Sequence, residues 1–278
     1  MTVRAAAVQL ESNASHAANL ASAEDGVRAA AKDGAKLVVL PEKWPLLTDD
    51  DATREGAELL DGPSMSMASD LAEELKIDLI AGSFAEQVAG TDLLSNTSIH
   101  FGPDGAAKAV YRKIHLFDAS VGGRDYLESA AFAPGDQPVL SETADGTIIG
   151  MAICFDIRFP ELFSNLAGAG AEVFVLPAAF TKVTTDAHWE VLLRARAIEN
   201  GCHIVAANQN GSDGIGRPSG GNSMIVSPWG KVLDRAPHGY SMALAELEAE
   251  DRAAAREALP MSDLRRNAAS FEAMRGNG

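Results

Sequence analysis

Cys154 stands where a thiol could act as a nucleophile. It ends the apolar run 146–154 (GTIIGMAIC), which predicts a strand, and the FDIRFPEL that follows predicts the start of a helix. Active sites of α/β proteins lie at the carboxyl ends of strands. The positive end of the following helix would favour a thiolate, and nearby backbone N–H groups could donate to an oxyanion. The alternative is a buried core thiol, which is the role we expect for Cys202.

Two charged residues also directly follow apolar strands. Glu42 comes after the fully apolar run 37–40 and Pro41, and desolvation there would make its carboxylate a better general base. Lys113, in YRKIHLFD, follows the predicted strand 107–111 and could supply fixed positive charge to a developing oxyanion. Taken singly, each would more often be an ordinary loop residue.

The elements that position these residues are short strands alternating with helices, with hairpins between some of them. The turns 102–105 (GPDG) and 227–230 (SPWG) indicate hairpins, so we expect mixed sheets covered by helices. Pro41 and Pro177 should stop their strands, 211–221 should be a surface loop, and the chain after Glu248 should be helical and extend away from the core. The expected strands are 3–10, 37–40, 78–84, 96–101, 107–111, 147–153, 173–176, 203–208, 223–226, 231–235 and 241–247, and the expected helices are 17–31, 64–75, 160–167 and 188–199.

Composition excludes several classes of function. The 278 residues carry a net charge of -16 with a pI of about 4.7, which argues against nucleic-acid binding. No apolar stretch reaches the roughly 18 residues of a membrane span, and two cysteines without a disulfide framework suit a cytoplasmic protein. Zinc-ligand spacing, a dinucleotide fingerprint, a phosphate loop and a GxSxG elbow are all missing from the sequence.

Five segments together carry a family resemblance: PEKW, YRKIHLFD, ICFDIRFPEL, LPAAFTKVTTDAHWEVLLRARAIEN and SMIVSPWGKVL. With them the chain resembles the nitrilase superfamily of carbon–nitrogen hydrolases, and most closely its omega-amidase and deaminated-glutathione amidase branch. The resemblance implies a four-layer αββα sandwich with two mixed sheets. It also implies a single domain over 1–278, with a core at about 1–247 and a tail at 248–278, and a homodimer or higher homo-oligomer.

The resemblance also implies roles for individual residues. Cys154 would attack the amide carbonyl, Glu42 would move the protons, and Lys113 with the N–H of Phe155 would hold the oxyanion. Glu128, in YLESAAFAPGD, matches a second glutamate that borders the site and orients Lys113. No metal or organic cofactor is implied.

The substrate-binding residues leave alternatives open. Arg158, four residues past Cys154, would grip a substrate carboxylate, or else form an ion pair with Glu161 or Glu190. Phe180 and Trp189 would line the pocket or pack in the core. We expect surface or interface pairs from Arg194, Arg196 and Glu199. One departure from the branch is Asn222, which stands where a histidine is common.

The sequence therefore predicts an amidase that acts on a small carboxylated amide. The substrate would be the omega-amide of a 2-oxo acid or deaminated glutathione, hydrolysed through a cysteine thioester. The alternatives are a carbamoylase or nitrilase acting on another small substrate, and a non-catalytic scaffold of the same fold.

Overall fold

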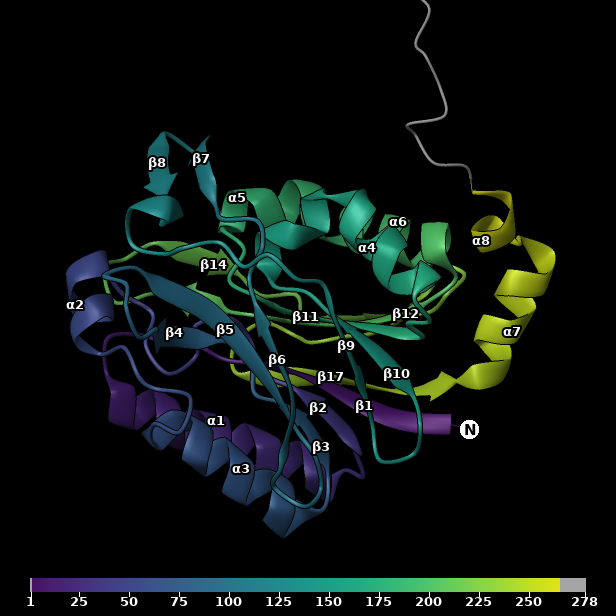
Figure 1. The fold of residues 1–278 in the computed structure, drawn as a ribbon, viewed down its shortest axis with the longest axis horizontal. Helices are drawn as coiled ribbons and strands as arrows, with labels where there is room; N and C mark the ends of the chain where they lie inside the picture. The colour runs from purple at the N-terminus through teal and green to yellow at the C-terminus, as the bar shows by residue number, and fades with distance from the viewer. Residues whose placement is uncertain (1, 266–278) are drawn as a thin grey trace, which may run out of the picture.

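The computed structural model describes residues 2–265 and has two β-sheets stacked face to face with helices on their outer faces (Figure 1). The first sheet has the strand order β17-β1-β2-β3-β5-β4, with β6 also paired to β5. Strands β1, β2 and β3 run parallel and the other pairs are antiparallel. Its strands are β1 (Thr2–Gln9), β2 (Leu37–Val39), β3 (Asp78–Ile80), β4 (Phe84–Gln87), β5 (Leu94–Phe101), β6 (Ala107–Arg112) and β17 (Ser241–Glu248).

The second sheet has the order β16-β15-β12-β11-β10-β9 and is also mixed, with only β10, β11 and β12 parallel. Its strands are β9 (Val139–Glu142), β10 (Ile148–Met151), β11 (Val173–Ala178), β12 (His203–Asn208), β15 (Met224–Val226) and β16 (Val232–Arg235). Two hairpins stand apart from the sheets: β7 (Asp118–Val121) with β8 (Arg124–Leu127), and β13 (Asn210–Ser212) with β14 (Pro218–Gly220).

Side chains on the two faces of β1 pack into two different hydrophobic cores, which hold the layers together. Ala5 and Ala7 belong to the core between the sheets, whereas Ala6 and Val8 pack in a separate core beneath the helices. A period of two places successive side chains on opposite faces, so a strand covered on both faces must be apolar throughout. Helices α1 (His16–Lys32) and α3 (Pro63–Leu75) cover the first sheet, and α4 (Pro160–Gly168) and α6 (Glu190–Asn200) cover the second (Figure 1). The expected four-layer αββα sandwich is therefore confirmed.

Two strand predictions differ from the structure. The predicted strand 78–84 is divided into β3 and β4, because the chain turns at Gly82 with φ +56°. A Cβ there would lie 2.2 Å from the Pro41 carbonyl oxygen, so only glycine fits this turn. Pro177 does not stop its strand, since β11 continues to Ala178. Pro177 has no N–H to donate to a neighbouring strand. Strand β10 ends at Met151, opposite Val175, so no residue of β10 lies opposite Pro177 and no hydrogen bond between the two strands is lost.

Two segments lie closer to the core than the sequence predicts. The expected surface loop 211–221 is largely the hairpin β13–β14. The chain after Glu248 does not extend away over 249–264. Helix α7 (Ala249–Ala258) instead packs beside the second sheet, where Arg256 donates to the Ala171 carbonyl (3.1 Å) and Arg252 pairs with Glu172. It is followed by α8 (Met261–Leu264). The rest of the expected tail lies outside the described residues.

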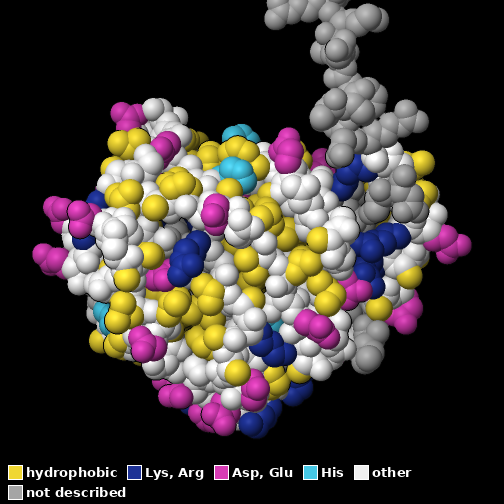
Figure 2. Space-filling model, viewed as in Figure 1, with side chains coloured by type: hydrophobic (Ala, Val, Ile, Leu, Met, Phe, Trp, Pro, Cys, Tyr) yellow, Lys and Arg dark blue, Asp and Glu magenta, His cyan; other side chains and the backbone are white. Residues whose placement is uncertain are grey.

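On the face of the molecule in Figure 2, Lys and Arg side chains lie in small separate groups among acidic and apolar ones. That face therefore has no extended basic surface of the kind that tracks a phosphate backbone. No helix between residues 2 and 265 is long and apolar enough to cross a bilayer.

Candidate active site

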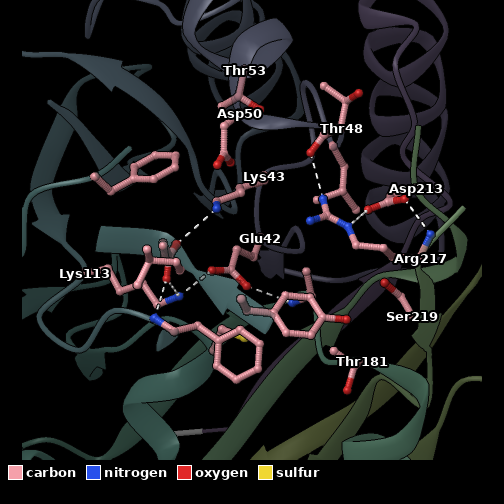
Figure 3. Close-up of a pocket in the computed structure, with 18 of the residues that line it drawn as sticks. Glu42, Lys43, Thr48, Asp50, Thr53, Lys113, Thr181, Asp213, Arg217 and Ser219 are labelled. Carbon is pink, nitrogen blue, oxygen red and sulfur yellow. Dashed lines mark hydrogen bonds and ion pairs between the residues drawn. The ribbon is translucent and has the colours of Figure 1, made fainter. Parts of the chain in front are cut away.

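Glu42, Lys113 and Cys154 line one pocket, although they follow strands of both sheets (Figure 3). Glu42 lies in the loop after β2 and Lys113 directly after β6, both in the first sheet, whereas Cys154 follows β10 of the second. The backbone N–H of Glu42 donates to the carbonyl of Ala178 at the end of β11, which joins the two sheets at this edge (3.3 Å). The pocket has a volume of about 190 Å³. Its rim comes from the short helix α2 (Asp50–Glu55) and from strands β8 and β14, which lie at one end of the sandwich in Figure 1.

Lys113 is buried between two carboxylates. Its ammonium donates to Glu42 Oε1 and to Glu128 Oε2, both at 2.8 Å. Burial by itself lowers the pKa of Lys113, but the charges of Glu128 and Glu42 outweigh burial and hold the pKa well above its usual value. The side chain is thus a fixed cation at the floor of the pocket.

Glu128 begins a short 3₁₀ turn, Glu128–Ala130, that follows β8. Its carboxylate accepts hydrogen bonds from Lys113, from the Phe117 N–H (2.7 Å) and from the Asn96 amide (3.1 Å), and it pairs with Lys43 (3.0 Å). Burial raises the pKa of Glu128, but the charges of Lys113 and Lys43 reverse this and hold the pKa well below its usual value. Two carboxylates and two ammonium groups therefore balance each other in this buried cluster.

The Glu42 carboxylate is held by donors on both oxygens. Oε1 accepts from Lys113 and from the Asn96 amide (2.8 Å), and Oε2 accepts from the Ala179 N–H (2.9 Å). The Cys154 thiol lies close enough to Glu42 for the carboxylate charge to raise the pKa of the thiol. A carboxylate fixed in this way can take a proton from the thiol without reorienting.

Cys154 begins a 3₁₀ turn, Cys154–Arg158, with φ +47°, a conformation that is strained for a residue other than glycine. Asp156 holds this turn, because its Oδ2 accepts from the Ile153 N–H (2.9 Å) and the Tyr111 hydroxyl (2.7 Å). His115 adds its backbone N–H (3.0 Å) and its ring Nδ1 (2.7 Å) to the other oxygen. The sharp turn presents the thiol to the pocket.

The thiol is neutral, in contrast to the expectation from the sequence that the following helix would favour a thiolate. Burial raises the pKa of Cys154 well above its usual value, the Glu42 charge raises it further, and Lys113 only partly opposes them. The 3₁₀ turn between Cys154 and α4 also separates the thiol from the first turn of that helix.

Arg158 lies on the other side of Cys154, beside a smaller cavity of about 20 Å³ that Cys154, Phe155 and Phe180 also line. Its guanidinium lies over the rings of Phe155 and Phe180, 5.6 and 5.5 Å from their centroids, and lies 3.3 Å from His188 Nδ1. The ion pair considered from the sequence, with Glu161 or Glu190, is not present in the described residues.

Trp189 packs in the core and lines neither cavity. It is 1% exposed, lies against Phe180 with ring centroids 4.8 Å apart, and donates to the Asn222 carbonyl (2.7 Å). Asn222 has φ +60°, which asparagine tolerates better than most residues. Its side chain bonds the Gly220 carbonyl rather than the catalytic cluster (2.9 Å).

The family model described as carbon-nitrogen hydrolase matches residues 4–257. This chain belongs to the carbon-nitrogen hydrolase family. It is 37% identical over 260 residues to the deaminated glutathione amidase of Synechocystis sp., covering 92% of this chain and 95% of that protein. It is also 37% identical over 265 residues to omega-amidase NIT2 of Danio rerio, covering 95% of each.

Solved structures agree with this assignment. Nit3 of Saccharomyces cerevisiae, a member of the nitrilase superfamily, superposes with a TM-score of 0.85 at 32% identity, and 97% of each chain is covered. The expected family is therefore confirmed. The present carbon-nitrogen hydrolase is an amidase that acts on small amides, and a cysteine thioester mechanism fits its family.

Several residues of the hydrolase pocket were not singled out from the sequence. Lys43 and Asn96 complete the charged cluster, Asp156 holds the nucleophile turn, and Arg217 lines the rim. The positions of Lys43, next to Glu42, and of Asp156, two residues after Cys154, are the only signals that could have found them. Asn96 and Arg217 are distant in sequence from the expected triad. Arg196, for which a surface or interface pair was expected, is buried. It donates to the Ile157 carbonyl (2.9 Å) and supports the nucleophile turn from α6, and it also pairs with Glu199 (3.0 Å).

Proposed function

We propose that this protein hydrolyses a small carboxylated amide, with Cys154 as nucleophile, Glu42 as general base and acid, and Lys113 as oxyanion stabiliser. The observation that supports this most strongly is the buried contact of Lys113 with Glu42 and Glu128 in the pocket that the Cys154 thiol also lines. The names of the relatives favour the omega-amide of a 2-oxo acid or deaminated glutathione as substrate.

Acylation begins when Cys154 Sγ attacks the amide carbonyl carbon while the thiol proton passes to Glu42. The carbonyl oxygen becomes an oxyanion, which Lys113 and the Phe155 N–H stabilise. Glu42 then protonates the leaving nitrogen, the C–N bond breaks, and the acyl group remains on Cys154 as a thioester.

Deacylation uses the same carboxylate a second time. Glu42 accepts a proton from a water molecule as the water oxygen attacks the thioester carbonyl. Collapse of the second tetrahedral intermediate breaks the C–S bond, releases the carboxylic acid and returns the proton to Cys154. No cofactor takes part in either half of this scheme. Glu128 acts by holding Lys113 in place and in its charged form.

Arg158 is the proposed partner of the substrate carboxylate on the acyl side. It lies beside Cys154, and its guanidinium rests on Phe155 and Phe180. His188 Nδ1 shares Nη1 and Nη2, and the remaining N–H donors of the guanidinium are available to a planar anion. The test compares an omega-amide carrying a carboxylate with a neutral amide of equal size. Arg158→Ala should raise KM for the carboxylated amide roughly ten- to a hundredfold more than for the neutral one. Equal effects on both would show that Arg158 only supports the loop.

Two alternatives have separate tests. A nitrilase or carbamoylase would hydrolyse small nitriles or carbamoyl compounds faster than any carboxylated amide in an ammonia-release screen. A non-catalytic scaffold would release no product from any of these substrates.

We further propose that the chain works as one domain in a cytoplasmic homodimer. Both sheets contribute to one pocket, which argues for a single functional unit. Two free cysteines persist most readily in a reducing compartment. The outward face of α6 exposes Val191 (67%) and Ile198 (43%), and Trp229 of the neighbouring turn is 62% exposed. A second copy packed on α4 and α6 would cover this apolar surface.

A further inference from the structure

Lys43 directly follows Glu42 in the loop after β2, and its side chain points into the active-site pocket (Figure 3). Its backbone has φ +50°, which is uncommon for a residue other than glycine, and its N–H donates to the Ser83 hydroxyl (3.0 Å). The next residue, Trp44, is buried and donates its ring N–H to the Ala81 carbonyl (2.7 Å). The loop is therefore fixed on either side of the Lys43 side chain.

The ammonium of Lys43 contacts one carboxylate and one aromatic ring. Its Nζ lies 3.0 Å from Glu128 Oε1 and 4.2 Å from the centroid of the Phe132 ring. Among residues 2–265, Glu128 is the only carboxylate within ion-pair distance of Lys43, whose side chain is 20% exposed. Asp50 and Asp125 line the same pocket but do not pair with it. Lys43 is therefore a largely buried cation with a single carboxylate partner.

Glu128 lies between two lysines, one on each of its oxygens. Oε2 accepts from Lys113 (2.8 Å), and Oε1 pairs with Lys43. Lys113 also donates to Glu42 Oε1 (2.8 Å), so positive and negative charges alternate from Lys43 to Glu42. Burial raises the pKa of Glu128, and the charges of Lys113 and then Lys43 oppose this. Without Lys43, two carboxylates would share the single positive charge of Lys113.

We propose that Lys43 is a positioning residue that neutralises Glu128 and so leaves the charge of Lys113 to Glu42 and, during turnover, to the oxyanion. The inference rests on the proposed function and adds to it the residue that sets the lower pH limit of activity. Glu42 must be ionised to accept the thiol proton. The remaining titratable group beside Lys113, the Cys154 thiol, is neutral in this state.

An uncompensated charge on Glu128 would favour proton binding by the whole cluster, which includes the base. The enzyme would then lose its ionised base at a higher pH. The quantity to measure is the acidic midpoint, the pH below the optimum at which kcat/KM falls to half its maximum. A residue that only packs against Phe132 would change kcat or stability but would leave this midpoint in place.

The test records ammonia release from the omega-amide of a 2-oxo acid as a function of pH. Lys43→Met keeps the aliphatic stem without the charge and should raise the acidic midpoint by about one pH unit or more. Lys43→Arg keeps the charge and should leave the midpoint near that of the wild type. Adding Glu128→Gln to Lys43→Met removes the carboxylate that Lys43 neutralises. The double variant should be slower, but its midpoint should return toward the wild-type value.

Lys108→Met is the matched control, because Lys108 is similarly exposed (27%) and also approaches a buried carboxylate, that of Asp78 (3.5 Å), but does not line the pocket. Its acidic midpoint should equal that of the wild type. Thermal unfolding checks that each variant is folded, and Lys43→Gln replaces Lys43→Met if the latter is not.

An unchanged midpoint in the folded, uncharged variant would overturn the proposal, whether kcat falls or KM rises. A midpoint that stays raised when Glu128→Gln is added would also overturn it, because Lys43 would then not act through Glu128. Wild-type enzyme that releases no ammonia from the amide at any pH would instead overturn the proposed function itself.

Discussion

At the scale of single residues, the main feature is that the Cys154 thiol is held in its neutral form beside the Glu42 carboxylate. Burial and the Glu42 charge both oppose a thiolate, and Lys113 compensates only in part. A neutral thiol resists alkylation and oxidation while no substrate is bound. In the proposed mechanism the thiolate forms only as its proton moves to Glu42. Glu42 is then neutral, and Lys113 stabilises the developing oxyanion together with the charge of Glu128.

The first prediction concerns the nucleophile. Cys154→Ala should lower kcat by more than about 10⁴-fold, because no other group can form the thioester. Thermal unfolding should show that the variant stays folded, and Cys202→Ala serves as the control with near-wild-type turnover. A folded Cys154→Ala protein that retains activity would rule out the proposed mechanism.

The second prediction concerns the pH dependence of the thiol. In a Cys202→Ala background, the rate of alkylation by iodoacetamide should still be rising at pH 9, because a raised pKa keeps the thiolate fraction small below that pH. Glu42→Gln removes a negative charge from beside the sulfur and should shift the rise to lower pH. An alkylation rate that levels off near neutral pH in the wild-type background would contradict the neutral thiol.

At the scale of elements, the reactive residues lie at strand ends, and neighbouring elements fix their directions. Asp156 connects the turn after β10 to Tyr111 of β6 and to His115, so the nucleophile turn depends on both sheets. A second buried link lies further from the pocket, where His100 of β5 joins Ser141 of β9 (2.7 Å) and Asp78 of β3 (3.1 Å). These polar contacts fix how one sheet lies on the other.

The third prediction concerns His203 in β12. Burial lowers its pKa from 6.5 to about 4, so the folded state holds a neutral ring that the unfolded chain protonates at higher pH. Stability from this residue is therefore complete above pH 6.5 and is lost as the pH falls toward 4. The loss is on the order of 3 kcal/mol. Urea unfolding of His203→Leu at pH 7 and pH 4.5 should show a smaller acid loss than wild type. The exposed His238→Leu is the control, and equal acid losses in wild type and His203→Leu would exclude this residue as the cause.

At the scale of the whole molecule, the pocket exists only because two mixed sheets meet at one edge. The first sheet supplies the base and the cation and the second supplies the thiol, while α2, β8 and β14 form the rim. The same stacking leaves α4 and α6 as an outer layer with apolar residues facing solvent on α6. Dimer formation would therefore bury the apolar surface of α6, on the outer side of the second sheet.

The fourth prediction tests that surface. Wild-type protein should be a dimer at micromolar concentration, with an interface of roughly 2,000 Å² or more. The double variant Val191→Asp, Ile198→Asp should shift it toward monomer in light scattering, because burying unpaired carboxylates is unfavourable. Leu59→Asp changes a similarly exposed apolar residue (57%) before α3 and should leave the assembly intact. A wild-type monomer would contradict the proposed dimer.

The sequence by itself determined the main helices and most strands of the two sheets, and it indicated the candidate triad. Strand β9 and the hairpins β7–β8 and β13–β14 were not predicted. Apolar periodicity and turn residues are local properties, so β12 was predicted with the bounds it has, and α1 and α3 were predicted to within a residue at each end. Glu42, Lys113 and Cys154 each closely follow an apolar strand, but only their combination in the segments that resemble the family selected them as a triad. The turn at Gly82 and the continuation of β11 through Pro177 were not predicted. The first depends on how closely the loop at Pro41 approaches, and the second on where the neighbouring strand β10 ends.

Only the tertiary structure decided the electrostatics of the site and the shape of the pocket. A pKa depends on burial and on charges a few ångströms away, and the groups concerned are distant along the chain: Lys113 lies 71 residues from Glu42. The raised pKa of Cys154 and the bonds from Asn96 to both glutamates follow from such contacts. Sequence patterns report which face of an element is apolar. Which polar groups meet across elements depends on packing in three dimensions.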